Sequence, residues 1–390
     1  MFSDRTNWKL TRNRLTDTLE EVKSNGAHVL DLTISNPTRI GLKFEDAQIL
    51  EALASPKAMD YDPQPKGLRS ARAAVANYYR TQHGIDSLDP ERVILTTSTS
   101  EGYSFVFRLL CNPGDELLVP KPSYPLFEFL ADLQDVKLVS YPLIYDYGWQ
   151  MDFPSLEKVV TRRTHGVVVV HPNNPTGSYV HAQEQASLNA FCAERGLAII
   201  ADEVFLDYSH NGEPQRSFVV NPDVLSFTLS GVSKISALPQ MKLAWIVTSG
   251  PAAQRDAAQA RLEVISDTYL SMNAPIQWAT PALLAQRERV QRQLLDRVLV
   301  NLAELDRQLD AQKMCQRLNV EGGWYAILRI PVTQTDEELA VDLLRRKSVL
   351  VHPGHFYDFP SDGYLVLSLI TAQTEFAEGI KRLLELVVAG

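Results

Sequence analysis

The sequence has few cysteines, no long apolar run and no excess of positive charge. Its three cysteines, Cys111, Cys192 and Cys315, lie far apart, so they predict neither a disulfide framework nor a metal-ligand spacing. No stretch approaches the length of a membrane-spanning helix, and no apolar core of a secretory signal follows the basic N-terminus. The net charge of −9 gives no support to nucleic-acid binding, which needs a basic patch. We expect a cytoplasmic protein without a membrane, nucleic-acid or metal partner.

The 390 residues contain a series of short, β-branched apolar runs. Several of these runs are apolar throughout, which is typical of strands covered on both faces in a mostly parallel sheet. The segments between several of them, such as 183–195, have helical patterns. The sequence therefore predicts an α/β fold with one large, doubly wound domain. The expected sheet has seven strands, at 93–97, 116–120, 136–141, 166–171, 197–203, 224–230 and 243–248.

After residue 275 the pattern changes. Segment 281–312 has apolar residues at helical spacing and no glycine, which predicts one or two long helices. Predicted strands and helices then alternate to the end of the chain, with strands within 322–331, 349–354 and 364–370 and a helix over 336–347. We expect a large domain over 46–280 and a smaller α+β domain built from 1–45 and 281–390.

Polar residues follow five of the predicted strands, where ligands bind in open α/β sheets. Each has a structural interpretation as well, because serines can cap a helix, a tyrosine can pack and an NNPTG sequence can form a turn. Asp202 and Lys234 are harder to explain in that way, since each lies in an apolar or uncharged stretch. The residues concerned are Ser98, Thr99, Ser100, Tyr124, Asn174, Asp202 and Lys234.

Together these groups fit one cofactor. A lysine amine forms a Schiff base with an aldehyde, and a carboxylate keeps a pyridinium nitrogen protonated. An aromatic ring stacks on a flat heterocycle, a helix N-terminus with hydroxyls suits a phosphate, and an amide bonds a phenolic oxygen. The combination indicates pyridoxal 5′-phosphate.

The same residues lie in motifs that resemble the class I/II aminotransferases of pyridoxal-phosphate fold type I. Three segments carry the resemblance in order and spacing: HPNNPTG at 171–177, IIADEVF at 199–205 and SGVSK at 230–234. Further similarity covers most of the chain, at 31–38, 61–72, 112–125, 322–331 and 351–356.

The resemblance implies a role for each residue at the site. Lys234 forms the Schiff base and shuttles a proton, Asp202 pairs with the ring nitrogen, and Tyr124 stacks on the ring. Asn174 donates to the ring oxygen and lies, with Ser35 and Asn36, near the substrate. Ser98, Thr99, Ser100 and Ser233 hold the phosphate. Tyr61 reaches it from the other subunit of a homodimer.

Three positions depart from the family pattern. Lys242 replaces an arginine that holds the phosphate, and lysine lacks the planar fork of that side chain. Phe205 replaces a tyrosine that donates to the ring oxygen, so we expect a more basic Schiff-base nitrogen. Val366 stands where the family has the arginine that binds the substrate carboxylate. We name Arg39 and His355 as candidates to replace that arginine.

The first functional prediction is an aminotransferase that acts on an amino acid and a 2-oxo acid by a ping-pong mechanism. The alternative is another reaction of the same cofactor, such as a C–S or β-lyase or a decarboxylase, because Val366 favours a non-standard substrate. A cofactor-binding sensor domain is a third interpretation, disfavoured because the basic residues do not cluster.

Overall fold

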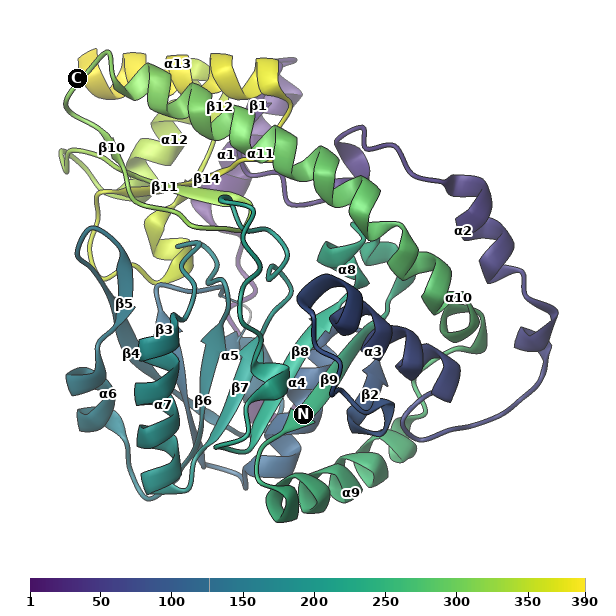
Figure 1. The fold of residues 1–390 in the computed structure, drawn as a ribbon. Helices are drawn as coiled ribbons and strands as arrows, with labels where there is room; N and C mark the ends of the chain where they lie inside the picture. Colours follow the sequence, from purple (N-terminus) through teal and green to yellow (C-terminus); the bar gives the residue numbers. More distant parts are fainter. Residues whose placement is uncertain (126, 390) are drawn as a thin grey trace.

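A sheet of eight strands forms the centre of the larger part of the molecule (Figure 1). The structure, a computed structural model, describes residues 1–125 and 127–389. All seven predicted strands are present. The prediction of seven strands was one too low, because a three-residue edge strand, β5, is too short to give a sequence pattern. In spatial order the strands are β2 (Val93–Thr96), β9 (Ala244–Ser249), β8 (Ser226–Gly231), β7 (Ala198–Asp202), β6 (Thr164–Val170), β3 (Glu116–Lys121), β4 (Lys137–Tyr145) and β5 (Trp149–Met151).

Most of this sheet is parallel, which brings the ends of its strands to one edge. β8, β7, β6, β3 and β4 pair in parallel. β9 is antiparallel to both β8 and β2, so β2 runs in the same direction as the parallel strands. The residues that follow β2, β3, β6, β7 and β8 therefore meet at the carboxyl edge of the sheet.

Both faces of the sheet are buried, because side chains alternate between them along each strand. In β6, Val168 packs on the face covered by α4 (Thr99–Leu110), α5 (Phe127–Asp132) and α9 (Ala252–Tyr269). Val167 packs on the opposite face against α6 (Phe153–Val159) and α7 (Ala182–Arg195). Near β2 and β9 that opposite face is covered by α3 (Arg69–His83) and α10 (Ala274–Ala285). This two-sided burial explains why the strands read as continuous apolar runs.

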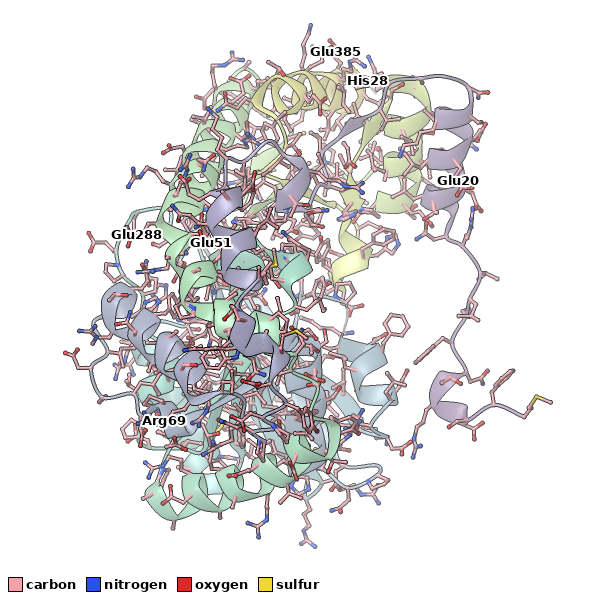
Figure 2. All side chains as sticks on the ribbon, turned by 90° about the vertical axis from the view of Figure 1, so that its right-hand side faces the viewer. Glu20, His28, Glu51, Arg69, Glu288 and Glu385 are labelled. Atoms are coloured by element: carbon pink, nitrogen blue, oxygen red, sulfur yellow. The ribbon has the colours of Figure 1, made fainter. Side chains whose placement is uncertain are left out.

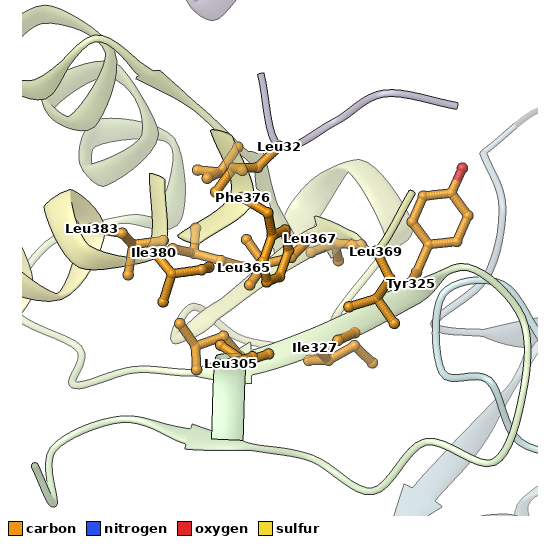
Figure 3. Close-up of a cluster of buried hydrophobic side chains, with 14 of the residues drawn as sticks. Leu32, Leu305, Tyr325, Ile327, Leu365, Leu367, Leu369, Phe376, Ile380 and Leu383 are labelled. Atoms are coloured by element: carbon orange, nitrogen blue, oxygen red, sulfur yellow. The ribbon is translucent and has the colours of Figure 1, made fainter. Parts of the chain in front are cut away.

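The C-terminal part has its own sheet and hydrophobic core. The antiparallel strands are β10 (Gln316–Arg317), β11 (Tyr325–Arg329), β14 (Tyr364–Ser368) and β13 (His352–Pro353), in that order. Helices α11 (Arg287–Leu309), α12 (Asp336–Lys347) and α13 (Gln373–Ala389) pack around them. In Figure 3, Leu305 of α11 and Phe376 of α13 meet Leu365 and Leu367 of β14 in this core.

Part of the N-terminal segment belongs to this second core. β1 (Leu30–Asp31) pairs in parallel with β12 (Val349–Leu350), and α1 (Arg14–Ser24) packs on α12. The first residues extend away from α1 (Figure 2), and the indole of Trp8 donates to Asp132 of α5 at 2.8 Å. α2 (Asp46–Leu53) packs against α10. The division of the chain at residues 45/46 and 280/281 stays a prediction; the second position lies within α10.

Among the described residues, no helix combines the length and the apolar character that crossing a membrane requires.

Candidate active site

A cavity of about 410 Å³ lies at the carboxyl edge of the large sheet, next to the smaller sheet. It is lined by nine of the predicted site residues, which come from segments up to 199 positions apart in the chain. Six of them are Thr99, Ser100, Tyr124, Asn174, Asp202 and Phe205. The other three are Ser35, Ser233 and Lys234.

Lys234 lies in the short helix α8 (Val232–Ile235), directly after β8. Its Nζ lies 4.7 Å from the ring centre of Trp324 and 5.3 Å from that of Phe205. Burial lowers the pKa of the amine to about 8, although the nearby charge of Asp202 acts to raise it. Within the described chain, Nζ has no hydrogen-bond partner. A half-buried, unbonded amine with a lowered pKa is a nucleophile and a base near neutral pH.

Asp202 ends β7 and faces the α4 side of the sheet, because Ala198 and Ile200 of the same strand pack on that side. The hydroxyl of Tyr103 in α4 donates to its Oδ2 at 3.0 Å, and the backbone N–H of Val204 donates to its Oδ1 at 3.1 Å. Burial raises the pKa of Asp202 to about 6, although both donors oppose this. The carboxylate is therefore poised to hold a cation inside the cavity.

The N-terminus of α4 offers donors to an anion. Ser98 is the N-cap, and its Oγ accepts the backbone N–H of Glu101 at 3.1 Å. Thr99 and Ser100 in the first turn line the cavity, as does Ser233 from the start of α8. The free N–H groups and positive dipole end of a 12-residue helix favour a phosphate there.

Asn174 follows β6 in the loop that the HPNNPTG segment forms. The preceding Asn173 has a structural role, since its Nδ2 donates to Pro122 O and to Thr176 Oγ1, both at 3.0 Å. By contrast, the Oδ1 of Asn174 is buried and has no hydrogen-bond partner in the described chain. A buried polar atom without a partner is costly, which favours a ligand at this position.

The remaining predicted residues lie outside the lining of the cavity. Lys242 is exposed and has a left-handed backbone conformation, and Tyr61 is 85% exposed. Asn36 is exposed, and its Oδ1 accepts the backbone N–H of Thr38 at 3.0 Å. Arg39 is also exposed. The roles predicted for these four residues stay predictions.

The structure shows where Val366 and the candidates to replace the missing arginine lie. Val366 is 1% exposed, in β14. His355, a sequence-based candidate to replace that arginine, is exposed and lies outside the lining of the cavity. His352, three residues earlier, lines it.

Sequence reasoning missed several residues at the site. Tyr103, Tyr208, Trp324 and His352 were not predicted, although Tyr103 could have been found from its position one helical turn after Thr99. Tyr208 donates through its hydroxyl to the carbonyl oxygen of Lys234 at 2.6 Å. The other contacts join segments far apart in the chain, which no local pattern records.

A buried polar network supports α8 from behind. Asp207 accepts from the hydroxyl of Tyr78 at 2.8 Å and lies 3.0 Å from Nε2 of His83. The Nε2 of Gln291, on α11, donates to Asp207 Oδ2 at 2.6 Å and to the carbonyl oxygen of Ile235 at 2.9 Å. This network and the Tyr208 bond together fix the backbone that carries Lys234.

Comparisons with known proteins identify the family of this chain. The model of the family "Aminotransferase class I and II" matches residues 27–377. Alanine aminotransferase of Mycobacterium bovis is 27% identical over 372 residues, which cover 93% of this chain and 86% of the relative. Glutamate-pyruvate aminotransferase AlaA of Haemophilus influenzae is 26% identical over 370 residues, covering 93% and 91%.

A solved structure shows the same fold. The alanine aminotransferase from Pyrococcus furiosus matches all of this chain with a TM-score of 0.90, over 100% of its own length, at 23% identity. The α/β fold and the family resemblance that the motifs predicted are thereby confirmed. The chain belongs to the class I and II aminotransferases, a family of enzymes.

Proposed function

We propose that this enzyme is a pyridoxal 5′-phosphate-dependent aminotransferase that moves an amino group between an amino acid and a 2-oxo acid. The observation that carries the proposal is the pair formed by Lys234 and Asp202. An amine and a carboxylate line one cavity, both half-buried and both with pKa values moved toward neutrality. Class I and II relatives named as alanine and glutamate-pyruvate aminotransferases support this substrate class.

The residues of the cavity suit the cofactor. Its aldehyde can condense with the unbonded amine of Lys234, and its ring nitrogen can pair with Asp202. The buried, unpartnered Oδ1 of Asn174 marks an amide that lacks a ligand. Thr99, Ser100 and Ser233 offer hydroxyl and N–H groups to the phosphate. Tyr124, 45% exposed at the cavity, can cover one face of the ring.

When bound, the cofactor's pyridinium ring accepts the electron pair of the substrate Cα–H bond as that bond breaks. Asp202 keeps the proton on the ring nitrogen, and the hydroxyl of Tyr103 helps it stay ionised. Lys234 would act as the base of the reaction. Its Nζ, free once a substrate amine is bound, would accept the proton from Cα and would later give it up to complete the transfer. The rings of Phe205 and Trp324 beside Nζ keep water from the base.

The reaction proceeds in two halves, because the 2-oxo product leaves before the second 2-oxo acid binds. The named relatives do not favour the alternative of a lyase or a decarboxylase. We further propose a cytoplasmic homodimer in which Tyr61, an exposed aromatic side chain, completes the phosphate site of the other copy.

Reductive trapping tests the covalent link. Borohydride treatment of the cofactor-loaded protein, followed by peptide mapping, should place the cofactor on Lys234. Lys234→Ala should lack the yellow colour and activity, whereas Lys158→Ala, which removes an exposed lysine of α6, should keep both. Trapping on another lysine, or a colourless wild-type protein, would overturn the proposal.

Half-reaction spectra test the reaction. An amino acid added alone should remove the visible band of the cofactor, and a 2-oxo acid added next should restore it. Release of pyruvate and ammonia without an acceptor would instead indicate a lyase. An unchanged spectrum with every amino acid and amine tried would contradict amino transfer.

A further inference from the structure

The cavity has little positive charge with which to bind an amino acid. Among the described residues that line it, only Lys234 and His352 carry basic side chains. Lys234 is the nucleophile and base of the proposed reaction. An amino-acid substrate also brings a carboxylate, which needs hydrogen-bond donors when it leaves water. His352 is the basic side chain that the proposed reaction leaves unused.

His352 lies beside Val366, the valine that stands where the family has the arginine that binds the substrate carboxylate. In the smaller sheet, β14 runs between β11 and β13, and Val366 is the register partner of Ile327 on one side and His352 on the other. Directly opposed residues of antiparallel strands point to the same face of a sheet. Three neighbouring side chains therefore lie in one row on that face, and the polar one is His352, next to Val366 and Ile327.

The imidazole is held by a neighbouring tyrosine. The hydroxyl of Tyr357 lies 3.0 Å from Nδ1 of His352, and both residues line the cavity. No hydrogen-bond partner of Nε2 is found in the part of the chain that the structure describes. When the Tyr357 hydroxyl donates to Nδ1, the ring carries its proton on Nε2, which is the free nitrogen.

The segments around this pair fix its place at the cavity. The backbone N–H of Ser123, one residue before Tyr124, donates to the carbonyl oxygen of Tyr357 at 3.0 Å. Tyr325, at the start of β11, also lines the cavity, and Figure 3 shows its ring at the edge of the apolar cluster. His352 thus lies on a strand of the smaller sheet, and the backbone hydrogen bond between Ser123 and Tyr357 joins this region to the larger part of the molecule.

We propose that His352, oriented by Tyr357, binds the substrate carboxylate through its Nε2–H in place of a guanidinium. This rests on the proposed function, since it names the group that recognises the amino acid at that site. Arg39 and His355, the candidates that the sequence suggested, are not needed for it. A single imidazole contacts one carboxylate oxygen, whereas a guanidinium can hold both oxygens.

Binding of unreactive ligands tests the assignment without relying on turnover. Propanoate and propanamide differ in the carboxylate only, and their Kd values are measured by calorimetry with the cofactor-loaded protein. Wild-type protein should prefer propanoate by about 10-fold or more, as expected of a hydrogen bond to a charged group. His352→Ala should lose this preference while its Kd for propanamide stays within about twofold. His352→Gln, which keeps an N–H donor, should retain part of it.

Two controls separate the possible outcomes. His355→Ala removes an exposed histidine of the same segment and should bind both ligands as the wild type does. With L-alanine as donor, His352→Ala should raise KM by about 10-fold or more and change kcat much less. An unchanged preference for propanoate in His352→Ala would overturn the assignment. If the wild-type protein transferred no amino group and His352→Ala still abolished the preference for propanoate, only the proposed function would be overturned.

Discussion

The hydroxyl of Tyr103 donates a hydrogen bond to Oδ2 of Asp202 at 3.0 Å, inside the sheet–helix interface. Tyr103 is 3% exposed and lies in α4, whose N-terminus lines the cavity. Helix α4 thus provides donors to the anion site at its N-terminus and, through Tyr103, stabilises the ionised form of Asp202. Because the hydroxyl stabilises the ionised form, it lowers a pKa that burial raises.

Tyr103→Phe should raise the pKa of Asp202 and weaken cofactor binding. A hydrogen bond to a buried charge contributes about 1.5–3 kcal/mol, so we expect cofactor Kd to rise by about 10-fold or more. The acid limb of the kcat profile should move to higher pH, because Asp202 then loses its charge at a higher pH. Cofactor titration and the pH profile measure the two effects.

Tyr141→Phe is the matched control for Tyr103→Phe. Tyr141 is 1% exposed and donates to the backbone carbonyl of Val168 at 2.8 Å, so its loss also removes one buried hydrogen bond. It should lower stability without moving the pH profile. A profile that shifts equally in both variants would show that Tyr103 acts through packing alone.

Asp202→Asn should change how the stability of the cofactor-free protein depends on pH. The pKa of Asp202 is raised from 3.8 to about 6, so the native state binds its proton more tightly than the unfolded state does. The stability from this group is complete below pH 3.8 and is lost as the pH rises through about 6. Relative to Asp202→Asn, the wild type should lose about 3 kcal/mol across this window.

Urea unfolding of both cofactor-free proteins between pH 4 and pH 7 measures this difference. Glu203 is also buried with a raised pKa, near 7, but it is present in both proteins and largely cancels. Added cofactor should reduce or reverse the difference, because a pyridinium partner favours the ionised Asp202. A stability difference that does not vary with pH would contradict the buried-carboxylate interpretation.

The sequence was most informative where the structure follows a local pattern. The apolar runs locate seven strands, and the helix expected over 336–347 is α12, with the same bounds. Thr335 caps that helix and Glu338 completes its capping box, so its start is encoded within four residues. β5 was missed because three residues carry no periodicity.

At the site, the sequence located residues that end strands but not those that contact them. Asp202 and Lys234 were found because charged groups stood in apolar or uncharged stretches. Tyr103 and Trp324 were missed, since their contacts with these two residues depend on tertiary packing. His352 was passed over for His355 because spacing alone does not tell whether the histidine in β13 or the one in the turn after it faces the cavity.

Gly177→Ala should destabilise the protein strongly. Gly177 follows the NNPT sequence with φ +67°, and a Cβ there would lie 2.5 Å from the carbonyl oxygen of Gly322 and overlap Val320. This position joins the loop that carries Asn174 to the segment before β11. We expect a loss of about 3 kcal/mol or more in unfolding free energy, together with weaker cofactor binding.

Gly196→Ala controls for backbone conformation alone. Gly196 has φ +65°, and a Cβ there meets nothing within 4 Å. Its substitution should therefore cost only about 1 kcal/mol. Equal losses in the two variants, measured by urea unfolding, would show that the contact with Gly322 contributes nothing.

Gln291→Leu should remove the link between the buried Asp207 and the backbone of α8. Its Nε2 donates to both Asp207 Oδ2 and Ile235 O, so the variant leaves two buried acceptors short of a donor. We expect a loss of about 2–4 kcal/mol in unfolding free energy, because one acceptor is charged. Capture of the cofactor by the adjacent Lys234 should also slow, since α8 is then held by fewer bonds.

Gln293→Leu, two positions along the same helix, separates this effect from a general change in α11. Gln293 also makes backbone hydrogen bonds, to Lys43, but they are exposed, and water can replace them. Its loss should cost about 1 kcal/mol or less and leave cofactor capture unchanged. Urea unfolding and stopped-flow absorbance give the two readings. If both variants captured the cofactor at the wild-type rate, the buried network would stabilise the fold without positioning Lys234.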